Sequence, residues 1–258
     1  MQIAEYARNY AFEADYWWFV GRRKLVLETL LPLVHGQSKA RLLDIGCGTG
    51  YTLGVMARHS EAYGLDVAIE GLAFCLGRGL GRLVQAEAEH LPFADESMDV
   101  VTALDVLEHL DDDDAALREW RRVCRPGGHL LIYVPALQSL WSGEDYVSQH
   151  RRRYRRAQLG RRVREAGFSI QKLTYANTAL LPAVVATVLC NRLFNRQALY
   201  RSNLKPLPKW LNRTLTFIFS TEARCLTRLD SPVGSSLLCL AQKPPSTVAT
   251  SAHAEQGV

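Results

Sequence analysis

The sequence predicts an α/β fold with a Rossmann-like, doubly wound sheet. Three observations support this prediction. Short apolar runs alternate with amphipathic stretches between residues 39 and 175. One run, 98–104, is almost continuously apolar, as expected of a parallel strand that is buried on both faces. A glycine-rich turn, 46–50, follows the first run. Such alternation indicates right-handed βαβ units, whose ligands bind at the carboxyl ends of the strands.

The individual elements follow in order along the chain. We expect strands at 41–45, 62–66, 82–86, 98–104 and 129–134, and helices between them at 51–59, 68–78 and 111–124. The acidic run Asp111–Asp114 favours the start of its helix, and Pro126-Gly127-Gly128 is expected to end it. An amphipathic helix from Arg156 to Gly167, a sixth strand at 168–175 and a seventh at 235–240 complete the predicted domain.

Length and composition exclude several classes of protein. The 258 residues are 48% hydrophobic and 22% charged, which excludes wholesale disorder and a polytopic membrane protein. The net charge of +5 is small for a nucleic-acid-binding protein, so we do not expect a nucleic-acid partner. The six cysteines show no metal-ligand spacing, and the N-terminus lacks an apolar signal segment. We therefore expect a cytoplasmic protein without a bound metal.

The glycine-rich turn is the clearest indication of a ligand site. Its spacing is G-x-G-x-G, and Asp44 precedes it. A carboxylate at this place is a poor neighbour for a pyrophosphate, but it suits a ligand that carries an ammonium and a sulfonium. Asp66 ends the second predicted strand, where a carboxylate can accept hydrogen bonds from a ribose diol. The alternative is an ordinary turn at the end of a strand.

Several motifs resemble those of the class I S-adenosylmethionine-dependent methyltransferases, in the ubiquinone/menaquinone-type (type 11) branch. They are DIGCGTG at 44–50, GLD at 64–66, AEAEHLPF at 86–93, LDVLEH at 104–109 and RPGG at 125–128. The resemblance implies a seven-stranded sheet with an antiparallel last strand, and S-adenosylmethionine as cofactor. It also implies that the cofactor is bound by Asp44, Gly46, Cys47, Gly48, Gly50, Asp66, Val67, Glu87, Ala88, Glu89, Leu104 and Asp105.

Two histidines are candidate general bases for methyl transfer. His109 ends the run 105–109, in which Asp105, Glu108 and His109 could face one space if a helical turn begins at Leu107. Similar runs bind a divalent cation in some ubiquinone-type O-methyltransferases. We favour a structural or positioning role for His109 over a base or a metal ligand.

His150 is the second candidate, in a long segment after the fifth predicted strand. Asp145 could pair with it, which would fix the imidazole tautomer and raise its basicity. Alternatively, both residues hold this segment against the domain. Eight arginines follow between 151 and 164. We expect them on a solvated helix face, although an anionic acceptor or RNA would also suit them.

The two ends of the predicted domain, 39–242, carry additional segments. Residues 1–38 are expected to form a helical cover. In one interpretation, Arg22 or Arg23 contacts the methionine carboxylate of the cofactor. In the other, the aromatic side chains of this segment only hold a helix against the sheet. A helical insertion at about 176–232 contains two apolar helices, 180–194 and 210–229. It could cap an acceptor tunnel, contact a membrane surface through 180–229, or bind a second subunit. The tail, 243–258, is expected to be disordered.

The function predicted from these observations is methyl transfer from S-adenosylmethionine, most simply to a hydroxyl. The acceptor is expected to be a small molecule, a sugar or a lipid-linked alcohol, and the protein cytoplasmic or peripheral at the membrane. An RNA methyltransferase and a non-catalytic, cofactor-binding partner subunit are the alternatives.

Overall fold

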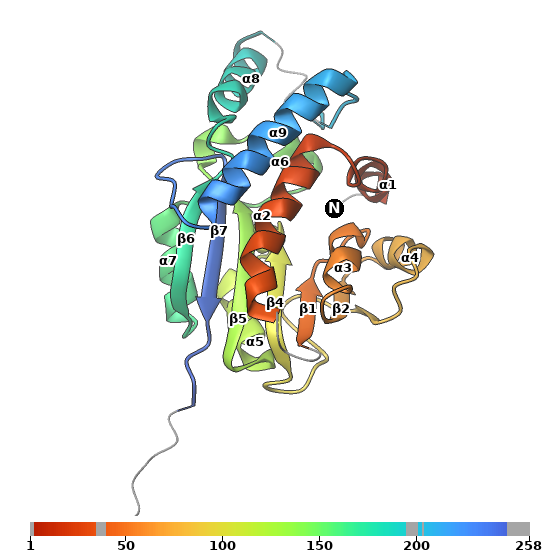
Figure 1. Ribbon diagram of the computed structural model, residues 1–258, viewed down its shortest axis with the longest axis vertical. Helices are drawn as coiled ribbons and strands as arrows, with labels where there is room; N and C mark the ends of the chain where they lie inside the picture. The colour runs from red at the N-terminus through yellow and green to blue at the C-terminus, as the bar shows by residue number, and fades with distance from the viewer. Residues whose placement is uncertain (1–2, 35–39, 195–200, 203, 247–258) are drawn as a thin grey trace, which may run out of the picture.

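The computed structural model describes residues 3–34, 40–194, 201–202 and 204–246. It contains a seven-stranded sheet in the order β3-β2-β1-β4-β5-β7-β6, in which β7 is antiparallel to both of its neighbours (Figure 1). The predicted fold class is confirmed. The strands are β1 (Arg41–Ile45), β2 (Glu61–Asp66), β3 (Leu83–Gln85), β4 (Met98–Leu104), β5 (Cys124–Pro135), β6 (Ser169–Ala176) and β7 (Ser236–Gln242).

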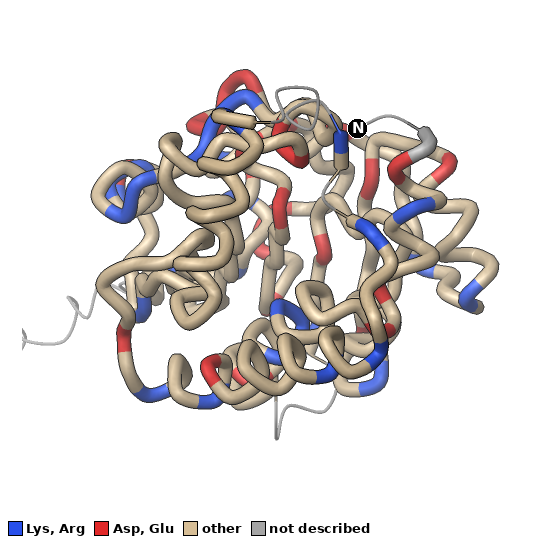
Figure 2. Tube along the Cα trace, turned by 90° about the horizontal axis from the view of Figure 1, so that it is seen from above, with Lys and Arg blue, Asp and Glu red and all other residues tan. Residues whose placement is uncertain are grey.

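Helices cover both faces of this sheet, as the view from above shows (Figure 2). They are α1 (Ile3–Phe12), α2 (Trp17–Val34), α3 (Tyr51–Met56), α4 (Ile69–Gly77), α5 (Asp113–Val123), α6 (Gly143–Val147), α7 (Arg156–Glu165), α8 (Leu181–Phe194) and α9 (Lys209–Leu226). Alternate residues of each strand feed the two cores. Leu43 and Val101 pack with α5 and α7, whereas Leu42 and Val100 pack with α2, α3 and α9.

The connection between α5 and β5 differs from the prediction. Pro126-Gly127-Gly128 does not separate the helix from a strand at 129–134, because β5 already begins at Cys124 and runs through these residues. Cys124 pairs with Met98 of β4. On the other side the main chain of Gly127 donates to the carbonyl of Lys243 over 2.8 Å. Gly127 has a φ of +76°, and the register with β4 is irregular between Cys124 and His129, so the turn sequence forms a bulge within β5 that contacts Lys243.

The same contacts correct the predicted start of the tail. Lys243 is buried, and its ammonium donates to the carbonyl of Cys124 over 2.8 Å and forms an ion pair with Glu96 at 3.1 Å. The tail therefore does not begin at residue 243. Residues 247–258 lie outside the described part of the chain.

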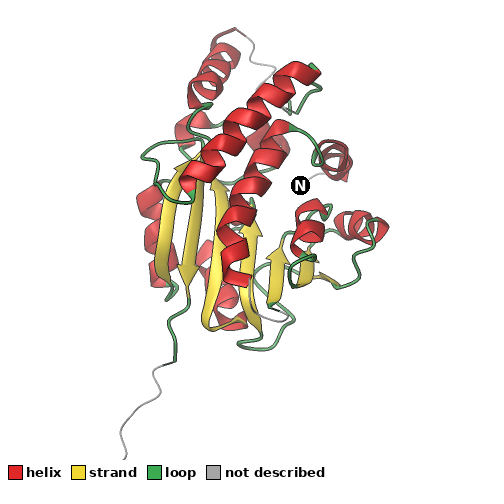
Figure 3. Cartoon of the chain, in the orientation of Figure 1, coloured by secondary structure: helices red, strands yellow, loops and turns green. Residues whose placement is uncertain are grey.

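The predicted helical insertion before the last strand is confirmed, and it consists of α8 and α9 (Figure 3). Helix α9 packs along α2, and Gly21 permits the close approach, because a Cβ at this position would lie 2.2 Å from the ring of Phe219. The side chain of Asn212 accepts from the main chain of Trp17 over 2.9 Å and donates to that of Asp15 over 2.8 Å. The insertion and the N-terminal helices thus form one packed unit.

Helix α8 is much less covered than α9. Among its residues only Val188 is buried, although most of its side chains are apolar. In the part of the chain that the structure describes, no helix combines the length and apolar character that a membrane span requires.

Candidate functional site

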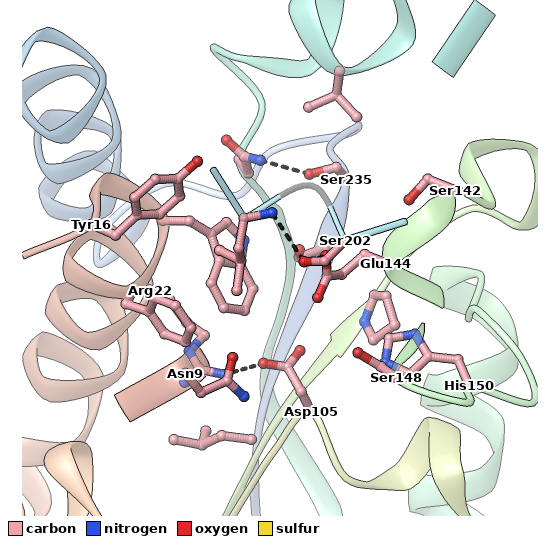
Figure 4. Close-up of a pocket in the computed structure, with 18 of the residues that line it drawn as sticks. Asn9, Tyr16, Arg22, Asp105, Ser142, Glu144, Ser148, His150, Ser202 and Ser235 are labelled. Atoms are coloured by element: carbon pink, nitrogen blue, oxygen red, sulfur yellow. Dashed lines mark hydrogen bonds and ion pairs between the residues drawn. The ribbon is translucent and has the colours of Figure 1, made fainter. Parts of the chain in front are cut away.

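A cavity of about 630 Å³ opens where the carboxyl ends of β1 and β4 meet the N-terminal helices and the insertion (Figure 4). This volume is in the range of sites for small-molecule ligands. Residues of three distant segments line it, among them Trp18 and Arg22 from α2, Asp44 and Asp105 from the sheet, and Val184 from α8. The position agrees with the rule that ligands of doubly wound sheets bind at the carboxyl ends of strands.

The glycine-rich turn forms one wall of this cavity. Gly46, Gly48 and Gly50 have φ values of +66°, +57° and +82°, which disfavour other residues. A Cβ on Gly46 would lie 2.4 Å from Val106, whereas one on Gly48 would meet no atom within 4 Å. Gly48, together with Cys47, faces the cavity. The open backbone at Gly48 leaves the space that a closely bound cofactor needs.

Two carboxylates flank this wall. Asp44 is buried and accepts a hydrogen bond of 2.6 Å from Thr102 Oγ1. Burial raises the pKa of Asp44 to about 6, because it outweighs the opposing effect of this hydrogen bond. Asp105 follows Leu104, which also lines the cavity, and has a φ of +57°. The acidic wall fits a cofactor that carries an ammonium and a sulfonium.

Arg22 neutralises part of this acidic wall. Its guanidinium forms an ion pair with Asp105 (Figure 4) and lies 4.7 Å from the centre of the Trp18 ring. Arg23 instead donates to the main-chain carbonyl of Glu13 over 2.8 Å. Of the two predicted arginines, Arg22 is the one that lines the cavity.

The other predicted cofactor residues lie outside this cavity. Asp66 is buried at the end of β2, where it accepts hydrogen bonds from the main chains of Gly48 and Ala68, each at 2.9 Å. Tyr6 of α1 donates a third hydrogen bond, of 3.0 Å, to Asp66. Helix α1 therefore covers the carboxylate that was predicted to hold the ribose.

The predicted adenine-binding segment lies beyond β3. Val67 is exposed, and Glu87 is exposed beside His90, with 3.3 Å between its carboxylate and the imidazole Nδ1. The carbonyl of Ala88 accepts a hydrogen bond of 2.9 Å from the indole of Trp120, and Glu89 is half-buried. The predicted cofactor residues thus form two groups, of which one lines the cavity and the other, from Asp66 to Glu89, lies outside it.

Two buried residues of the N-terminal segment were missed by the sequence analysis. Besides Tyr6, Glu13 is buried and accepts 2.6 Å and 2.5 Å hydrogen bonds from Thr49 and Arg78. These contacts tie α1 to the glycine-rich turn and to the end of α4. The only signal in the sequence was that acidic and aromatic residues are interspersed before residue 20, which does not identify their partners.

The predicted pairing of Asp145 with His150 is confirmed by a 2.9 Å contact between the carboxylate and the imidazole Nδ1. Asp145 is fully buried, and it also accepts hydrogen bonds from Arg153 and from the main chain of Ser142 at 2.7 Å. Burial opposes ionisation of Asp145, but the hydrogen bonds from His150 and Arg153 outweigh it and lower its pKa to about 2. When an ionised Asp145 accepts from Nδ1–H, the lone pair of a neutral His150 imidazole is on Nε2, which lies 3.8 Å from Glu108 Oε1.

The run 105–109 is only partly arranged as predicted. Asp105, which pairs with Arg22, and His109 both line the cavity, whereas Glu108 is buried beside His109 and His150. The rings of His109 and His150 meet edge to face at 4.7 Å between centres. Ligand atoms of Glu108, His109 and His150 lie within 4.8 Å of one another, a grouping that could hold a metal ion.

Glu108 is the least satisfied group of this cluster. It is fully buried, and neither carboxylate oxygen has a hydrogen-bond partner within the described residues. Burial, with the nearby charge of Asp105, raises the pKa of Glu108 well above its usual range. Burial and the neighbouring His150 lower the pKa of His109 to about 3. His109 is therefore uncharged near neutral pH, and the raised pKa of Glu108 favours its neutral form beside His150, whose Nε2 lies 3.8 Å from Glu108 Oε1.

The arginines that follow His150 mainly contact protein. Arg151 pairs with Asp111, Arg152 with Asp113 at 3.2 Å, and Arg162 with Asp113 at 2.8 Å. These pairs tie the segment to the acidic start of α5. The charges of these three arginines are thus compensated by carboxylates, which disfavours an RNA-binding role. On α7 itself Arg156, Arg161 and Arg164 are exposed, as expected of a solvated helix face.

The end of the cavity farthest from the glycine turn combines polar and apolar groups. Ser142 and Glu144 lie near His150 (Figure 4), and Glu144 accepts a hydrogen bond of 2.9 Å from Ser202. The wall that the insertion forms is mixed. Its apolar residues include Leu180, Val184, Val188 and Leu215, and its polar or charged residues include Thr187, Asn191, Arg201 and Lys205.

Comparisons with known proteins agree with this geometry. Residues 43–132 match the family described as "Methyltransferase domain". The chain is 36% identical to a malonyl-[acyl-carrier protein] O-methyltransferase of Methylococcus capsulatus over 41% of this chain and 42% of that protein. It is also 36% identical to a ubiquinone/menaquinone biosynthesis C-methyltransferase, UbiE, of Vibrio parahaemolyticus, over 43% of this chain and 48% of that protein.

The similarity covers less than half of the length of either relative. Among solved structures, the putative methyltransferase in complex with the Trm112 methyltransferase activator of Haloferax volcanii aligns with a TM-score of 0.60. The alignment covers 98% of this chain and 97% of that chain at 17% identity, which shows a shared fold only.

Proposed function

The chain contains a class I S-adenosylmethionine-dependent methyltransferase domain of the type 11 branch, and from this premise we propose that it methylates a hydroxyl of a small-molecule, sugar or lipid-linked acceptor. A lipid-linked alcohol is the favoured acceptor. The observation that carries the proposal is the pairing of Asp145 with His150, because His150 lines the same cavity as Asp44 and Asp105.

The acidic wall would hold the cofactor. When bound, S-adenosylmethionine supplies a methyl group on a sulfonium, so the protein has to align the reactants and exclude water. Asp44 and Asp105 would attract its positive charges, and the open backbone at Gly48 would accept its close approach. Arg22 lies where it could exchange Asp105 for the methionine carboxylate. The ribose and the adenine would lie at Asp66 and at Glu87–Glu89, as the resemblance implies.

His150 would act as general base. Asp145 would hold Nδ1–H, so that the neutral imidazole could take a proton at Nε2 from the acceptor hydroxyl as its oxygen bonds to the methyl carbon. The carbon–sulfur bond breaks in the same displacement, and the positive charge that arises on His150 is balanced by Asp145. His109 stays neutral and positions the His150 ring through their edge-to-face contact.

The apolar part of the cavity wall would accommodate an acceptor with an apolar body. Leu180, Val184 and Val188 of the insertion offer hydrocarbon surface, whereas Ser142 and Glu144 offer hydrogen-bonding groups beside His150. This arrangement suits a hydroxyl at the polar end of an apolar molecule. Burial of each methylene of that body would contribute about 0.8 kcal/mol.

The proposal is tested with the purified full chain, S-adenosylmethionine labelled in its methyl group, and a lipid extract or a set of long-chain alcohols. We expect labelled methyl ethers, which mass spectrometry identifies. His150→Ala should lower kcat by about 10²- to 10⁴-fold, the usual contribution of a general base, with unchanged binding of S-adenosylhomocysteine. His59→Ala, at an exposed histidine of the cofactor half, is the matched control. Label on carbon or nitrogen, or full activity of His150→Ala, would contradict the proposal.

The same measurements test the alternative of a non-catalytic, cofactor-binding subunit. Such a protein would bind S-adenosylhomocysteine in calorimetry but would transfer no label to any acceptor unless a second protein were added. Turnover by the isolated chain excludes this alternative.

A further inference from the structure

The helical insertion exposes an unusual amount of apolar surface. On α8, Leu193 and Phe194 are 72% and 84% exposed, and on α9, Trp210 and Phe217 are 69% and 72% exposed. Large apolar side chains that are exposed to this degree and grouped on two neighbouring helices indicate an interaction surface, whereas single exposed apolar residues are common on any protein. These helices form the end of the molecule that is uppermost in Figure 1.

The exposed face of α9 alternates rings with arginines. Trp210, Arg213, Phe217 and Arg224 follow one another at intervals of three, four and seven residues, which places them on one side of α9, and Arg228 lies in the turn just after the helix. All five are exposed. The opposite side of α9 is buried against α2. We call the five residues the α9 stripe.

The charge around this stripe is strongly one-sided. Residues 177–233 contain eight Lys or Arg and two acidic residues, so the net charge of this segment is larger than the net charge of +5 of the whole chain. Both acids are occupied: Glu222 accepts 2.8 Å hydrogen bonds from the main chains of Thr178 and Ala179, and Asp230 pairs with Lys172 at 2.7 Å. Within the described residues, Arg224 is the one member of the stripe that forms an ion pair, with Glu28 at 4.0 Å.

We propose that the α9 stripe and the end of α8 dock on the surface of an anionic lipid bilayer. Rings and arginines on one helix face are typical of helices that lie in the membrane interface, where the rings enter the headgroup region and the arginines meet lipid phosphates. A second copy of the chain is a poorer occupant. An isologous contact would place the arginine stripe opposite itself, with like charges facing each other.

Docking would also bring the apolar part of the cavity wall to the lipid. Val184 and Val188, which line the cavity, lie on the same helix as Leu193 and Phe194. The docking rests on the exposed surface and its charge, and does not require the proposed reaction. If the reaction is as proposed, a lipid-linked acceptor would approach along α8.

The test is co-sedimentation of the full chain with vesicles of phosphatidylcholine, with and without one third phosphatidylglycerol. We expect binding to the anionic vesicles only, and weaker binding at high salt. Replacing Arg213 and Arg228 by Gln should weaken binding about 25-fold, since each basic residue near the surface contributes about 1 kcal/mol, or about fivefold. Trp210→Ala with Phe217→Ala should abolish it.

Two control variants remove the same kinds of side chain, one apolar and one basic, at positions outside the α9 stripe. Leu76→Ala removes an exposed apolar side chain from α4, and Arg58→Gln removes an exposed charge after α3. Both should bind vesicles as the unchanged protein does, and all variants should bind S-adenosylhomocysteine equally. This separates failure of docking from failure of the proposed function. The proposal is overturned if the protein binds neither the neutral nor the anionic vesicles. It is also overturned if light scattering shows that the unchanged protein is a dimer and that the double variant Trp210→Ala, Phe217→Ala is a monomer.

Discussion

Asp44 is ionisable close to neutral pH because it is buried at the cavity wall, where its pKa is about 6. Its carboxylate is therefore charged at pH 7.5 and neutral at pH 5. A ligand ammonium gains from the charged form only, so we expect the affinity for S-adenosylhomocysteine to fall about tenfold for each pH unit below 6. Calorimetry across this range measures the slope. Asp44→Asn should bind more weakly and without the slope, and an unchanged slope in that variant would assign it to another group.

His109 is expected to make the folded state sensitive to acid. Its pKa is about 3 in the folded protein against an ordinary value of 6.5, so the unfolded chain binds the proton more readily. The contribution of neutral His109 to the free energy of unfolding is fully present above pH 6.5 and is lost as the pH falls toward 3. At pH 5 the loss amounts to about 2 kcal/mol.

This loss is measured as the difference between the unchanged protein and His109→Asn in urea unfolding at pH 7.5 and 5, with chelator present. Asp44 and Glu108, whose pKa values are raised, contribute the opposite slope, but they do so in both proteins and cancel in the comparison. His59→Asn, at an exposed position, should keep the full pH dependence. An equal slope in His109→Asn would show that this imidazole is not buried as neutral.

At the level of elements, α1 has to share Asp66 with the cofactor. The hydroxyl of Tyr6 and two main-chain donors already occupy this carboxylate. A ribose diol needs two acceptor positions, so the Tyr6 hydrogen bond has to be given up when the cofactor binds. Tyr6→Phe removes this competitor, and we expect S-adenosylhomocysteine to bind about fivefold more tightly, the contribution of one net hydrogen bond.

Tyr10→Phe is the matched control, because Tyr10 lies on the same helix and stacks on Phe74 at 4.6 Å without contacting Asp66. It should leave the affinity unchanged. Weaker binding by Tyr6→Phe would mean that the hydroxyl stays in place and supports the bound ribose.

The strands and helices of the core could be predicted because their signals are local. The apolar runs gave the bounds of β1 and β4 to the residue, and Asp112 caps α5 as its acidic run suggested, with a 2.8 Å bond from the main chain of Ala115. The path of the chain through Pro126-Gly127-Gly128 could not be predicted. It depends on hydrogen bonds with Lys243, more than 100 residues later.

For the molecule as a whole, the parts of the site that could be predicted are those with local sequence signals, and the parts that could not are contacts between distant segments. The glycine turn and the Asp145–His150 pair lie within short segments, and their patterns identified them. The pairs that close the site join residues far apart in the sequence: Arg22 with Asp105, Tyr6 with Asp66, and Glu13 with Thr49. No periodicity specifies such partners, so the cover over the ribose carboxylate became visible only in the folded chain.

The cavity is assembled from the N-terminal helices, the sheet and the insertion, so its depth is a property of the whole molecule. If α8 holds the apolar body of the acceptor, Val184→Trp should fill that wall. We expect kcat/KM to fall at least tenfold for long-chain alcohols, because about two methylenes or more lose their burial at about 0.8 kcal/mol each. Short-chain alcohols and S-adenosylhomocysteine should be unaffected. Ala186→Trp, at an exposed position of the same helix, is the control. If Val184→Trp lowered kcat/KM equally for short-chain and long-chain alcohols, the apolar body of the acceptor would not lie along α8.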